Sequence, residues 1–403
     1  MKRTATLFLL CMPFLGSAQE CANGRYTDPA HFPDVTVTTA VPFGANTGVS
    51  GGNQVLRMDV YEPTNDMLDA RPVVLVAFGG SFISGTRGDV ADICEAFARM
   101  GYVAVAPDYR VGFFLPNATT TTRAVMRGAH DMRACVRYLR KTVAEDGNPY
   151  RIDPERIIIG GVSAGAISAI HATYLNEESE IPAVLIPESA AMGGIEGNSG
   201  TPGYSSEVLA CYSFSGAIGD TTWIVPGDKP LASIHEVGDG VVPYYTQEVS
   251  VVGIPTGLIA SGSHDIHLRF NNIGVPNCFL SYPGNGHVGY LQSDAANAIA
   301  FVAQFMADMV CGAPLACANT LAVDELTEPA ASLPYPNPSA DRVWLDLPTG
   351  AWATLSDLQG RVLQTVRATT DRVEFDLSGL ANGVYVLHST VHPHGVQVVK
   401  VDY

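Results

Sequence analysis

Positive charge and long apolar runs are both scarce in this chain. Its 403 residues hold 23 Lys and Arg against 40 Asp and Glu, which gives a formal net charge of −17. A surface so poor in cations is unsuited to nucleic acid or to anionic membranes, so we expect neither as a partner. No segment reaches the ~20 apolar residues that a helix needs to cross a bilayer, so we expect no transmembrane segment.

Cysteine is sparse as well, at 8 residues, and its spacing matches no zinc motif. His264 and His267 have the spacing of a ligand pair, but no other residue type nearby supports a metal. We interpret this stretch as a solvated helix start, and we expect neither a metal site nor a cofactor.

The N-terminus has the pattern of an export signal. Lys2 and Arg3 precede an apolar stretch at residues 7–15, and small residues follow it. We therefore predict that residues 1–18 are a secretory signal peptide that is removed on export. Cys11 would leave with it, and the seven remaining cysteines are an odd number, so at least one should be free.

The predicted winding of the chain limits the cysteine pairing. Cys94 and Cys135 fall on helices that right-handed crossovers place on opposite faces of a sheet, so no bridge between them is expected. Cys311 and Cys317, just past a predicted helix, are better candidates. We expect them to pair with each other, with Cys21 or with Cys94.

Apolar runs typical of strands alternate with segments typical of helices up to about residue 310. Strands are predicted at residues 35–41, 55–61, 73–78, 102–106, 156–160, 208–214, 231–235 and 279–282, and helices at 90–100, 124–141, 164–175 and 294–309. This alternation predicts an α/β fold with a mostly parallel sheet. Residues 176–206 are rich in glycine and have no clear period, so a lid or loop over a site could lie there.

The composition changes at Gly312. Residues 312–332 are rich in Ala, Pro, Thr and acidic residues and are interpreted as a linker between a first domain at 19–311 and a second at 333–403. Six short strands at close spacing are predicted in the second domain, at residues 342–347, 352–356, 361–366, 373–377, 383–388 and 395–401. They predict a small, independent β-sandwich.

A serine between a predicted strand and a predicted helix stands out. Residues 161–165 read Gly-Val-Ser-Ala-Gly, and strand, sharp turn and helix are the context of a nucleophile elbow, with Ser163 as the nucleophile. Residues 48–52 match the same pattern, but they lie among Gly, Asn, Thr and Ser with no strand directly before them and no helix after them. Ser50 is therefore interpreted as a turn residue.

A serine hydroxyl needs a base to remove its proton, and the base needs a carboxylate to orient it. His287 is the predicted base, because it lies on a glycine-rich loop just after the last predicted core strand. Asp239 is the predicted acid, in the loop after strand 231–235, and Glu236 is its nearest rival. The chain order Ser, Asp, His is that of an α/β-hydrolase.

Acyl transfer also needs donors for an oxyanion. The N–H of Ala164, directly after the nucleophile, should supply one, and the loop after the third strand should supply others from Gly80 and Ser81.

Three other polar residues are expected to be structural. Asp108 and Asp131 should form ion pairs with nearby arginines, and His171 should be packed in the core.

Residues ~30–310 resemble a secreted carboxylesterase-type α/β-hydrolase. The matching stretches are residues 56–61, 78–80, 106–110, 161–165 and 227–231. The resemblance implies an ester-hydrolysing triad of Ser163, Asp239 and His287. In one departure, Phe78 stands where this family usually has His before the Gly-Gly pair.

Residues ~333–403 resemble the C-terminal sorting domain of the bacterial type IX secretion system. Four ordered motifs match, at residues 335–338, 355–362, 380–385 and 398–401. The resemblance implies the secretion machinery as a partner and a final location at the cell surface or in the medium, after passage through the periplasm. A carbohydrate-binding sandwich is the alternative, but it has few aromatic residues beyond Trp344 and Trp352 to support it.

These features together predict an exported serine hydrolase that cleaves small or polymer-borne carboxylic esters through an acyl-enzyme. One alternative is a serine peptidase or acyl-peptide hydrolase with the same triad, which amidase activity on peptides would reveal. Another is an inactive hydrolase fold that serves as a surface-binding protein, which a fluorophosphonate probe would distinguish. The sequence leaves the acyl and alcohol parts of the substrate open.

Overall fold

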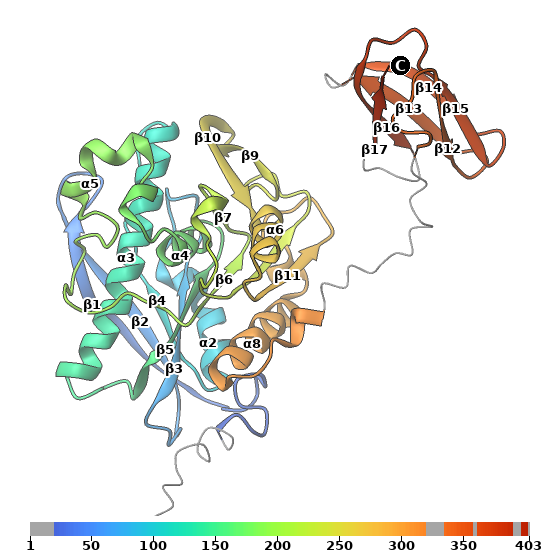
Figure 1. Cartoon of the computed structure of the whole chain (residues 1–403). Helices are drawn as coiled ribbons and strands as arrows, with labels where there is room; N and C mark the ends of the chain where they lie inside the picture. Colours follow the sequence, from blue (N-terminus) through green and yellow to red (C-terminus); the bar gives the residue numbers. More distant parts are fainter. Residues whose placement is uncertain (1–19, 320–333, 358–360, 390–395, 402–403) are drawn as a thin grey trace, which may run out of the picture. The chain divides into compact units, whose positions relative to one another are not determined.

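The chain forms two units, residues 1–321 and residues 322–403, which are described separately (Figure 1). The computed structural model describes residues 20–319, 334–357, 361–389 and 396–401. The predicted signal peptide at residues 1–18 and most of the predicted linker lie outside these residues.

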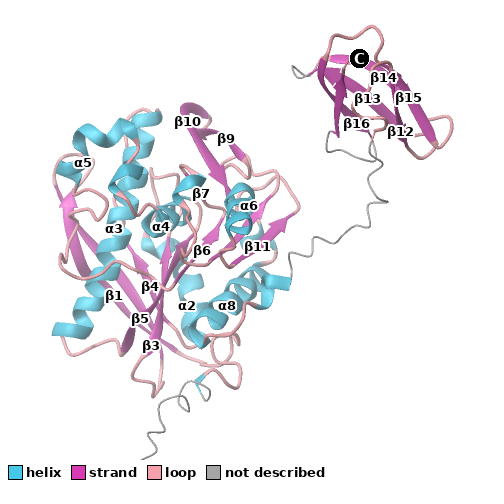
Figure 2. Ribbon diagram, in the orientation of Figure 1, coloured by secondary structure: helices cyan, strands magenta, loops and turns pink. Residues whose placement is uncertain are grey.

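The first unit is built on an eight-stranded sheet with the order β1-β2-β4-β3-β5-β6-β8-β11 (Figure 2). The strands are β1 Val35–Thr47, β2 Asn53–Pro63, β3 Arg71–Ala77, β4 Val103–Pro107, β5 Ile152–Gly161, β6 Ala210–Phe214, β8 Leu231–Glu236 and β11 Asn277–Tyr282. From β4 to β11 all neighbours are parallel, and β2 is antiparallel to both β1 and β4. The predicted α/β class with a mostly parallel sheet is confirmed.

Helices cover both faces of this sheet. They are α2 Ala91–Arg99, α3 Ala118–Glu145, α4 Ala164–Tyr174, α5 Ile186–Met192, α6 Ser263–Ile273, α7 Tyr290–Ser293 and α8 Ala295–Cys311, with 3-10 turns η1 Arg87–Val90, η2 Glu178–Glu180, η3 Ala183–Leu185, η4 Thr221–Trp223 and η5 Ala316–Asn319. Because β4 and β5 lie on opposite sides of β3, right-handed crossovers place α2 and α3 on opposite faces. The packing agrees, since α2 contacts α8 whereas α3 contacts α4.

The start of α3 lies six residues before the predicted one. Asn117 caps the helix, because its side chain accepts a hydrogen bond from the N–H of Thr120, whose hydroxyl accepts one from the N–H of Asn117. This capping box stabilises a first turn of threonines that helix propensity alone disfavours. Within the described residues, no helix is long and apolar enough to cross a membrane.

A small sheet that the sequence patterns did not predict lies after β6. It has the order β7-β10-β9 and consists of β7 Ala217–Ile218, β9 Thr246–Val251 and β10 Ile254–Gly262. Strands β9 and β10 form a hairpin whose two-residue turn, Val252 and Gly253, has positive φ at both positions. Such a turn fits the twist of a hairpin, but a β-branched residue is rare in it, so the turn residues are a weak signal for a hairpin.

The second unit is all β. Its strands form a two-stranded sheet, β12-β15, and a four-stranded sheet, β14-β13-β16-β17, and every pair is antiparallel. They are β12 Arg342–Asp346, β13 Trp352–Asp357, β14 Val362–Arg367, β15 Arg372–Asp376, β16 Gly383–Ser389 and β17 Val396–Lys400. Residues of both sheets form one apolar core that includes Val343, Leu355 and Phe375, as predicted for a small β-sandwich.

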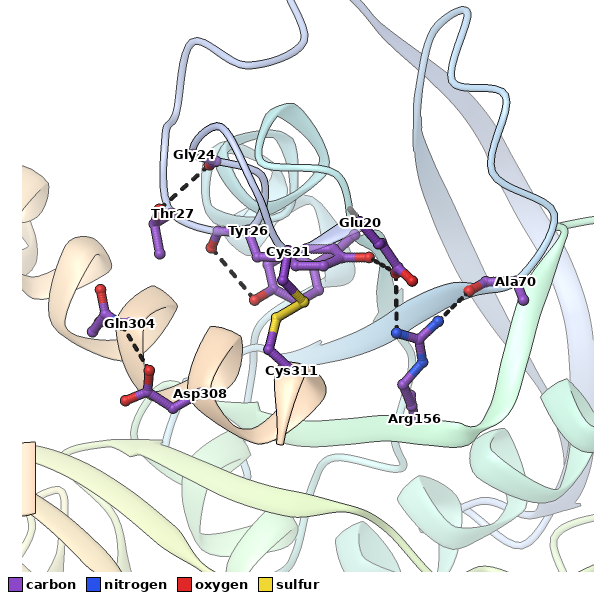
Figure 3. The surroundings of a disulfide bond; sticks show 11 residues. Glu20, Cys21, Gly24, Tyr26, Thr27, Ala70, Arg156, Gln304, Asp308 and Cys311 are labelled. Atoms are coloured by element: carbon purple, nitrogen blue, oxygen red, sulfur yellow. Dashed lines mark hydrogen bonds and ion pairs between the residues drawn. A yellow bond between two sulfur atoms is a disulfide. The ribbon is translucent and has the colours of Figure 1, made fainter. Parts of the chain in front are cut away.

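Two disulfides link distant segments of the first unit. Cys21 pairs with Cys311, which was one of the expected partners, and this bridge fixes the N-terminal segment to the end of α8 (Figure 3). Beside it, Arg156 donates to Glu20 Oε1 and to the carbonyl of Ala70, as Figure 3 shows.

The prediction for Cys317 was wrong, because it pairs with Cys278 in β11. After α8 the chain folds back along β11 through η5, a return that the sequence pattern did not indicate. Cys94 and Cys135 are not bridged, as predicted, and with Cys211 they are buried free thiols.

We expect peptide mapping under non-reducing conditions to recover Cys21 with Cys311 and Cys278 with Cys317. In native buffer a thiol reagent should leave the three free cysteines unmodified, because they are buried and burial raises the pKa of each thiol. The same reagent should modify all three after unfolding. A Cys311–Cys317 peptide, or rapid labelling of the native protein, would contradict this arrangement.

Candidate active site

Ser163 occupies a sharp turn between β5 and α4. Its φ of 55° and ψ of −118° are strained for a residue with a side chain. The flanking glycines permit this turn, since a Cβ on Gly161 or on Gly165 would lie 2.4 Å or 2.3 Å from the carbonyl oxygen of Ala77. The backbone N–H of Ser163 donates to the carbonyl of Phe214, which fixes the turn to β6.

The structure brings Ser163, His287 and Asp239 into one chain of hydrogen bonds. His287 Nε2 lies 2.8 Å from Ser163 Oγ, and His287 Nδ1 lies 2.7 Å from Asp239 Oδ2. The side chain of Asp239 has no exposure, whereas that of His287 is 20% exposed. An ionised carboxylate only accepts hydrogen bonds, so Nδ1 carries the proton and Nε2 is free to accept from the Ser163 hydroxyl.

These three residues meet because each follows a parallel strand at the same edge of the sheet. Ser163 follows β5, Asp239 follows β8 and His287 follows β11. The loops after β8 and β11 are also joined directly, since the N–H of Val237 donates to the carbonyl of Tyr282 and that of Gly238 to the carbonyl of Gly284.

The carboxylate of Asp239 is surrounded by donors. Oδ1 accepts from the N–H groups of Val241 and Val242, at 2.8 and 3.0 Å, and Oδ2 faces two imidazoles, those of His287 and His235. Burial alone would raise the pKa of Asp239, but the hydrogen bonds from His235 and His287 outweigh it and hold the pKa well below the ordinary value of 3.8. Asp239 is therefore charged in the folded protein near neutral pH.

His235 is a site residue that the sequence analysis missed. It is the fifth residue of β8 and fully buried, and its Nε2 lies 3.3 Å from both Asp239 Oδ2 and the carbonyl oxygen of Val242. Nε2 must carry a proton to interact with these two acceptors, so Nδ1, 2.9 Å from Ser263 Oγ, accepts from that hydroxyl in the neutral ring. A histidine within an apolar strand gives no sequence signal for this role.

Glu236, the rival acid, does not bond His287. Its Oε2 accepts from the N–H of Gly289, 3.1 Å away. Its carboxylate also lies against Gly286, where a Cβ would come within 2.6 Å of Oε1. Glu236 thus fixes the loop that carries His287.

The loop after β3 approaches Ser163 in a strained conformation. Gly80, Ser81 and Phe82 all have positive φ, at 118°, 54° and 59°, and the carbonyl of Gly80 accepts from the N–H groups of Ile83 and Ser84. Ser81 and Phe82 line the pocket at Ser163 together with Ala164, whereas Gly80 lines an adjacent cavity. Ala164 begins α4, so its N–H is among those that have no partner within the helix.

The pocket beside Ser163 has a volume of about 80 Å³ and mostly apolar walls. Its side chains come from the loop after β3, the turn at Ser163, α3, α4, β7 and the residues after it, the loop at residues 241–243 and the β9–β10 hairpin, and none of them carries a formal charge at neutral pH. Residues 176–206, all of them described, do not line this pocket. The hairpin, and not the stretch suggested by the sequence, covers the candidate site.

Asp108, Asp131 and His171 have the structural roles that the sequence analysis predicted. Asp108 Oδ1 pairs with Arg87 at 2.9 Å, and buried Asp131 Oδ1 pairs with Arg110 at 2.9 Å. His171 is buried, donates from Nδ1 to the carbonyl of Ile167, and has a pKa that burial lowers to about 4.

The stretch from His264 to His267 is only partly solvated, contrary to the prediction. His264 Nδ1 lies 2.7 Å from Asp265 Oδ1, but His267 is buried, stacks on Phe279 and bonds Asn277 through Nδ1. Within the described residues, no group of three or more His, Cys, Asp or Glu side chains could hold a metal ion.

Comparison with known families agrees with both resemblances found in the sequence. Residues 58–207 match the BD-FAE family, and residues 334–400 match the secretion system C-terminal sorting domain. The chain thus contains an esterase-type α/β-hydrolase domain and a C-terminal sorting domain, which indicates export to the cell surface or outside.

Curated relatives match a shorter part of the chain. It is 30% identical over 152 residues to chlorogenic acid esterase of Aspergillus niger, which is 36% of this chain and 29% of that protein. It is 29% identical over 137 residues to lipase 1 of Geotrichum candidum, which is 32% of this chain and 23% of that protein. The chain thus spans less than a third of the length of these relatives.

Among solved structures, esterase 2 of Thermogutta terrifontis is similar to this chain. The form phosphorylated by paraoxon is 22% identical, with a TM-score of 0.46, and the match covers 65% of this chain and 92% of that one. The form phosphoramylated by tabun is 21% identical, also with a TM-score of 0.46, and the match covers 64% and 92%.

The lowered pKa of Asp239 predicts a specific acid sensitivity. A carboxylate whose pKa is lower in the folded than in the unfolded state stabilises the fold above the unfolded pKa, and this contribution is lost as the pH falls towards the folded pKa. Relative to Asp239→Asn, the wild type should therefore lose more of its free energy of unfolding between about pH 5 and pH 3. Urea unfolding of both proteins across this range measures the difference, and a constant difference would refute the linkage.

Proposed function

We propose that the protein is an exported serine hydrolase that cleaves carboxylic esters without a cofactor. The observation that carries this proposal is the chain of hydrogen bonds from Ser163 through His287 to a buried, charged Asp239, at the side of an apolar pocket. A hydroxyl, a neutral imidazole and a carboxylate in this order are what acyl transfer by a serine requires.

In the proposed reaction, Ser163 Oγ attacks the ester carbonyl while its proton passes to His287 Nε2. The carbonyl oxygen becomes an oxyanion, and the N–H groups of Ala164, at the start of α4, and of Gly80 and Ser81, in the loop after β3, are the proposed donors that stabilise it. His287 then gives the proton to the leaving alkoxide, and an acyl-enzyme forms. Water, deprotonated by the same imidazole, releases the acid and restores the Ser163 hydroxyl.

An ester is favoured over a peptide by the domain family and by the names of the relatives, which are esterases and lipases. We also propose the domain boundaries that the sequence suggested, with a signal peptide at 1–18, a catalytic domain at 19–311, a linker at 312–332 and a sorting domain at 333–403. Every residue assigned to the chemistry lies in the catalytic domain, so the sorting domain serves export alone.

Ser163→Ala should lower ester hydrolysis by at least ~1,000-fold and abolish labelling by a fluorophosphonate probe, because the nucleophile is lost. Ser50→Ala is the matched control, since Ser50 lies in an equivalent pentapeptide but in the exposed turn between β1 and β2. It should keep wild-type activity and labelling. Equal activity of the two variants would exclude Ser163 as the nucleophile.

His235→Phe should move the acid limb of the kcat/KM profile to higher pH. Without the His235 donor, Asp239 keeps more of its negative charge, which favours the protonated, inactive imidazole of His287. His235→Gln retains an N–H donor and should restore part of the wild-type profile. Kinetics between about pH 4.5 and 8 measure both variants. If His235 served packing alone, Phe would lower activity equally at every pH.

A further inference from the structure

We propose that Tyr109 is a positioning residue for the oxyanion: its hydroxyl holds the main chain of the loop after β3, so that the N–H groups of Gly80 and Ser81 stay in place to bind it. This inference rests on the proposed function, because it assigns a role in the same reaction to a residue outside the triad. It follows from the way in which the segment after β4 binds both ends of the loop after β3.

The loop after β3 has free donors and a strained main chain. Among the described residues, neither the N–H of Gly80 nor that of Ser81 donates a hydrogen bond, whereas the carbonyl of Gly80 accepts two. Gly80, Ser81 and Phe82 have φ angles of 118°, 54° and 59°, a region that only glycine adopts easily. Three such residues in a row keep this conformation only if contacts from outside the loop hold it.

Tyr109 supplies such a contact at the start of the loop. Its hydroxyl donates to the carbonyl of Phe78 at 2.7 Å, and its ring stacks on that of Phe78 with the ring centroids 4.3 Å apart. The preceding carbonyl, that of Ala77, accepts from the N–H of Val162 at 2.9 Å. The nucleophile turn and Tyr109 thus fix two successive carbonyls, and these fix the direction in which the chain enters Gly79.

The same segment also holds the far end of the loop. The N–H of Gly112 donates to the carbonyl of Phe82 at 2.5 Å, and the ring of Phe82 lies edge-on to that of Tyr109. The carbonyl of Gly112 in turn accepts from Arg127 of α3 at 2.6 Å. Residues 109–112 therefore hold the loop at both ends, with the two proposed donors between them.

The hydroxyl of Tyr109 can keep this role over a wide pH range. Tyr109 is 1% exposed, and burial raises its pKa well above the usual value of 10. The hydroxyl therefore stays protonated wherever an imidazole titrates. Tyr109→Phe should lower kcat/KM by the same factor at every pH, whereas His235→Phe should move the acid limb of the profile.

The test probes the oxyanion with 2,2,2-trifluoroacetophenone. Ser163 Oγ adds to the carbonyl carbon of this ketone, the proton passes to His287, and the ketone oxygen becomes an oxyanion. Tyr109→Phe should weaken inhibition by this ketone and lower kcat for 4-nitrophenyl acetate, each about five- to thirtyfold, because the loop no longer holds its donors in place. KM for the ester and inhibition by acetophenone, which forms no stable adduct, should change by less than about twofold, because neither depends on an oxyanion.

Tyr212→Phe is the matched control. Tyr212 is also fully buried, and its hydroxyl donates to the carbonyl of Leu75, in the middle of β3, at 3.0 Å. This variant should lose a similar amount of stability in urea but keep both kcat and the inhibition by trifluoroacetophenone. Equal losses of kcat in the two variants, or a Tyr109→Phe protein that loses stability alone, would overturn the role of Tyr109.

Arg127→Met is a second variant, at a half-buried position. It releases Gly112, so it should reproduce the pattern of Tyr109→Phe with smaller losses. If Tyr109→Phe does not fold, unchanged kcat and trifluoroacetophenone inhibition in Arg127→Met would overturn the proposal. Failure of the wild type to cleave any ester, together with no fluorophosphonate labelling of Ser163, would instead overturn the proposed function.

Discussion

The candidate site depends on a negative charge that folding removes completely from water. The Asp239 side chain has no exposure, and such a charge is stable only when donors surround it. Two backbone N–H groups and two imidazoles supply them, and they come from β8, the loop after it and the loop after β11. A shift of β8 against β11 would separate the carboxylate from His287, whereas its other three donors belong to β8 and the loop after it. The orientation of His287 at Asp239 therefore depends on the register of β8 and β11.

Much of this could be predicted, because parallel strands end at a common edge. A serine, an aspartate and a histidine that each follow a predicted strand must lie along that edge, and the Gly-Val-Ser-Ala-Gly pentapeptide marks the turn. The structure adds the physical reason for its glycines, since Ala77 O lies where their side chains would be. The β-sandwich was predictable in the same way, from alternation and turn residues, and its six strands agree with the predicted ranges to within one residue or so.

The remaining features depend on contacts between distant segments. His235 reads as an ordinary strand residue until β8 is placed beside the loop at Val242. Glu236 could be read as a rival acid, because only the folded loop shows that it bonds Gly289 and not His287. Cys317 reaches Cys278 only because the chain reverses its direction after α8, and no local sequence pattern indicates this reversal. The positive φ angles at Ser81 and Phe82 are likewise imposed by the approach of this loop to the nucleophile.

The residues proposed to react with the substrate and those that form the wall of the pocket lie on different parts of the fold. Ser163, Asp239 and His287 lie on short loops fixed to the central sheet, where a small displacement would break their hydrogen bonds. The β9–β10 hairpin, by contrast, belongs to a separate small sheet and contributes only side chains to the wall of the pocket. Its side chains can therefore change in size without moving the reacting groups.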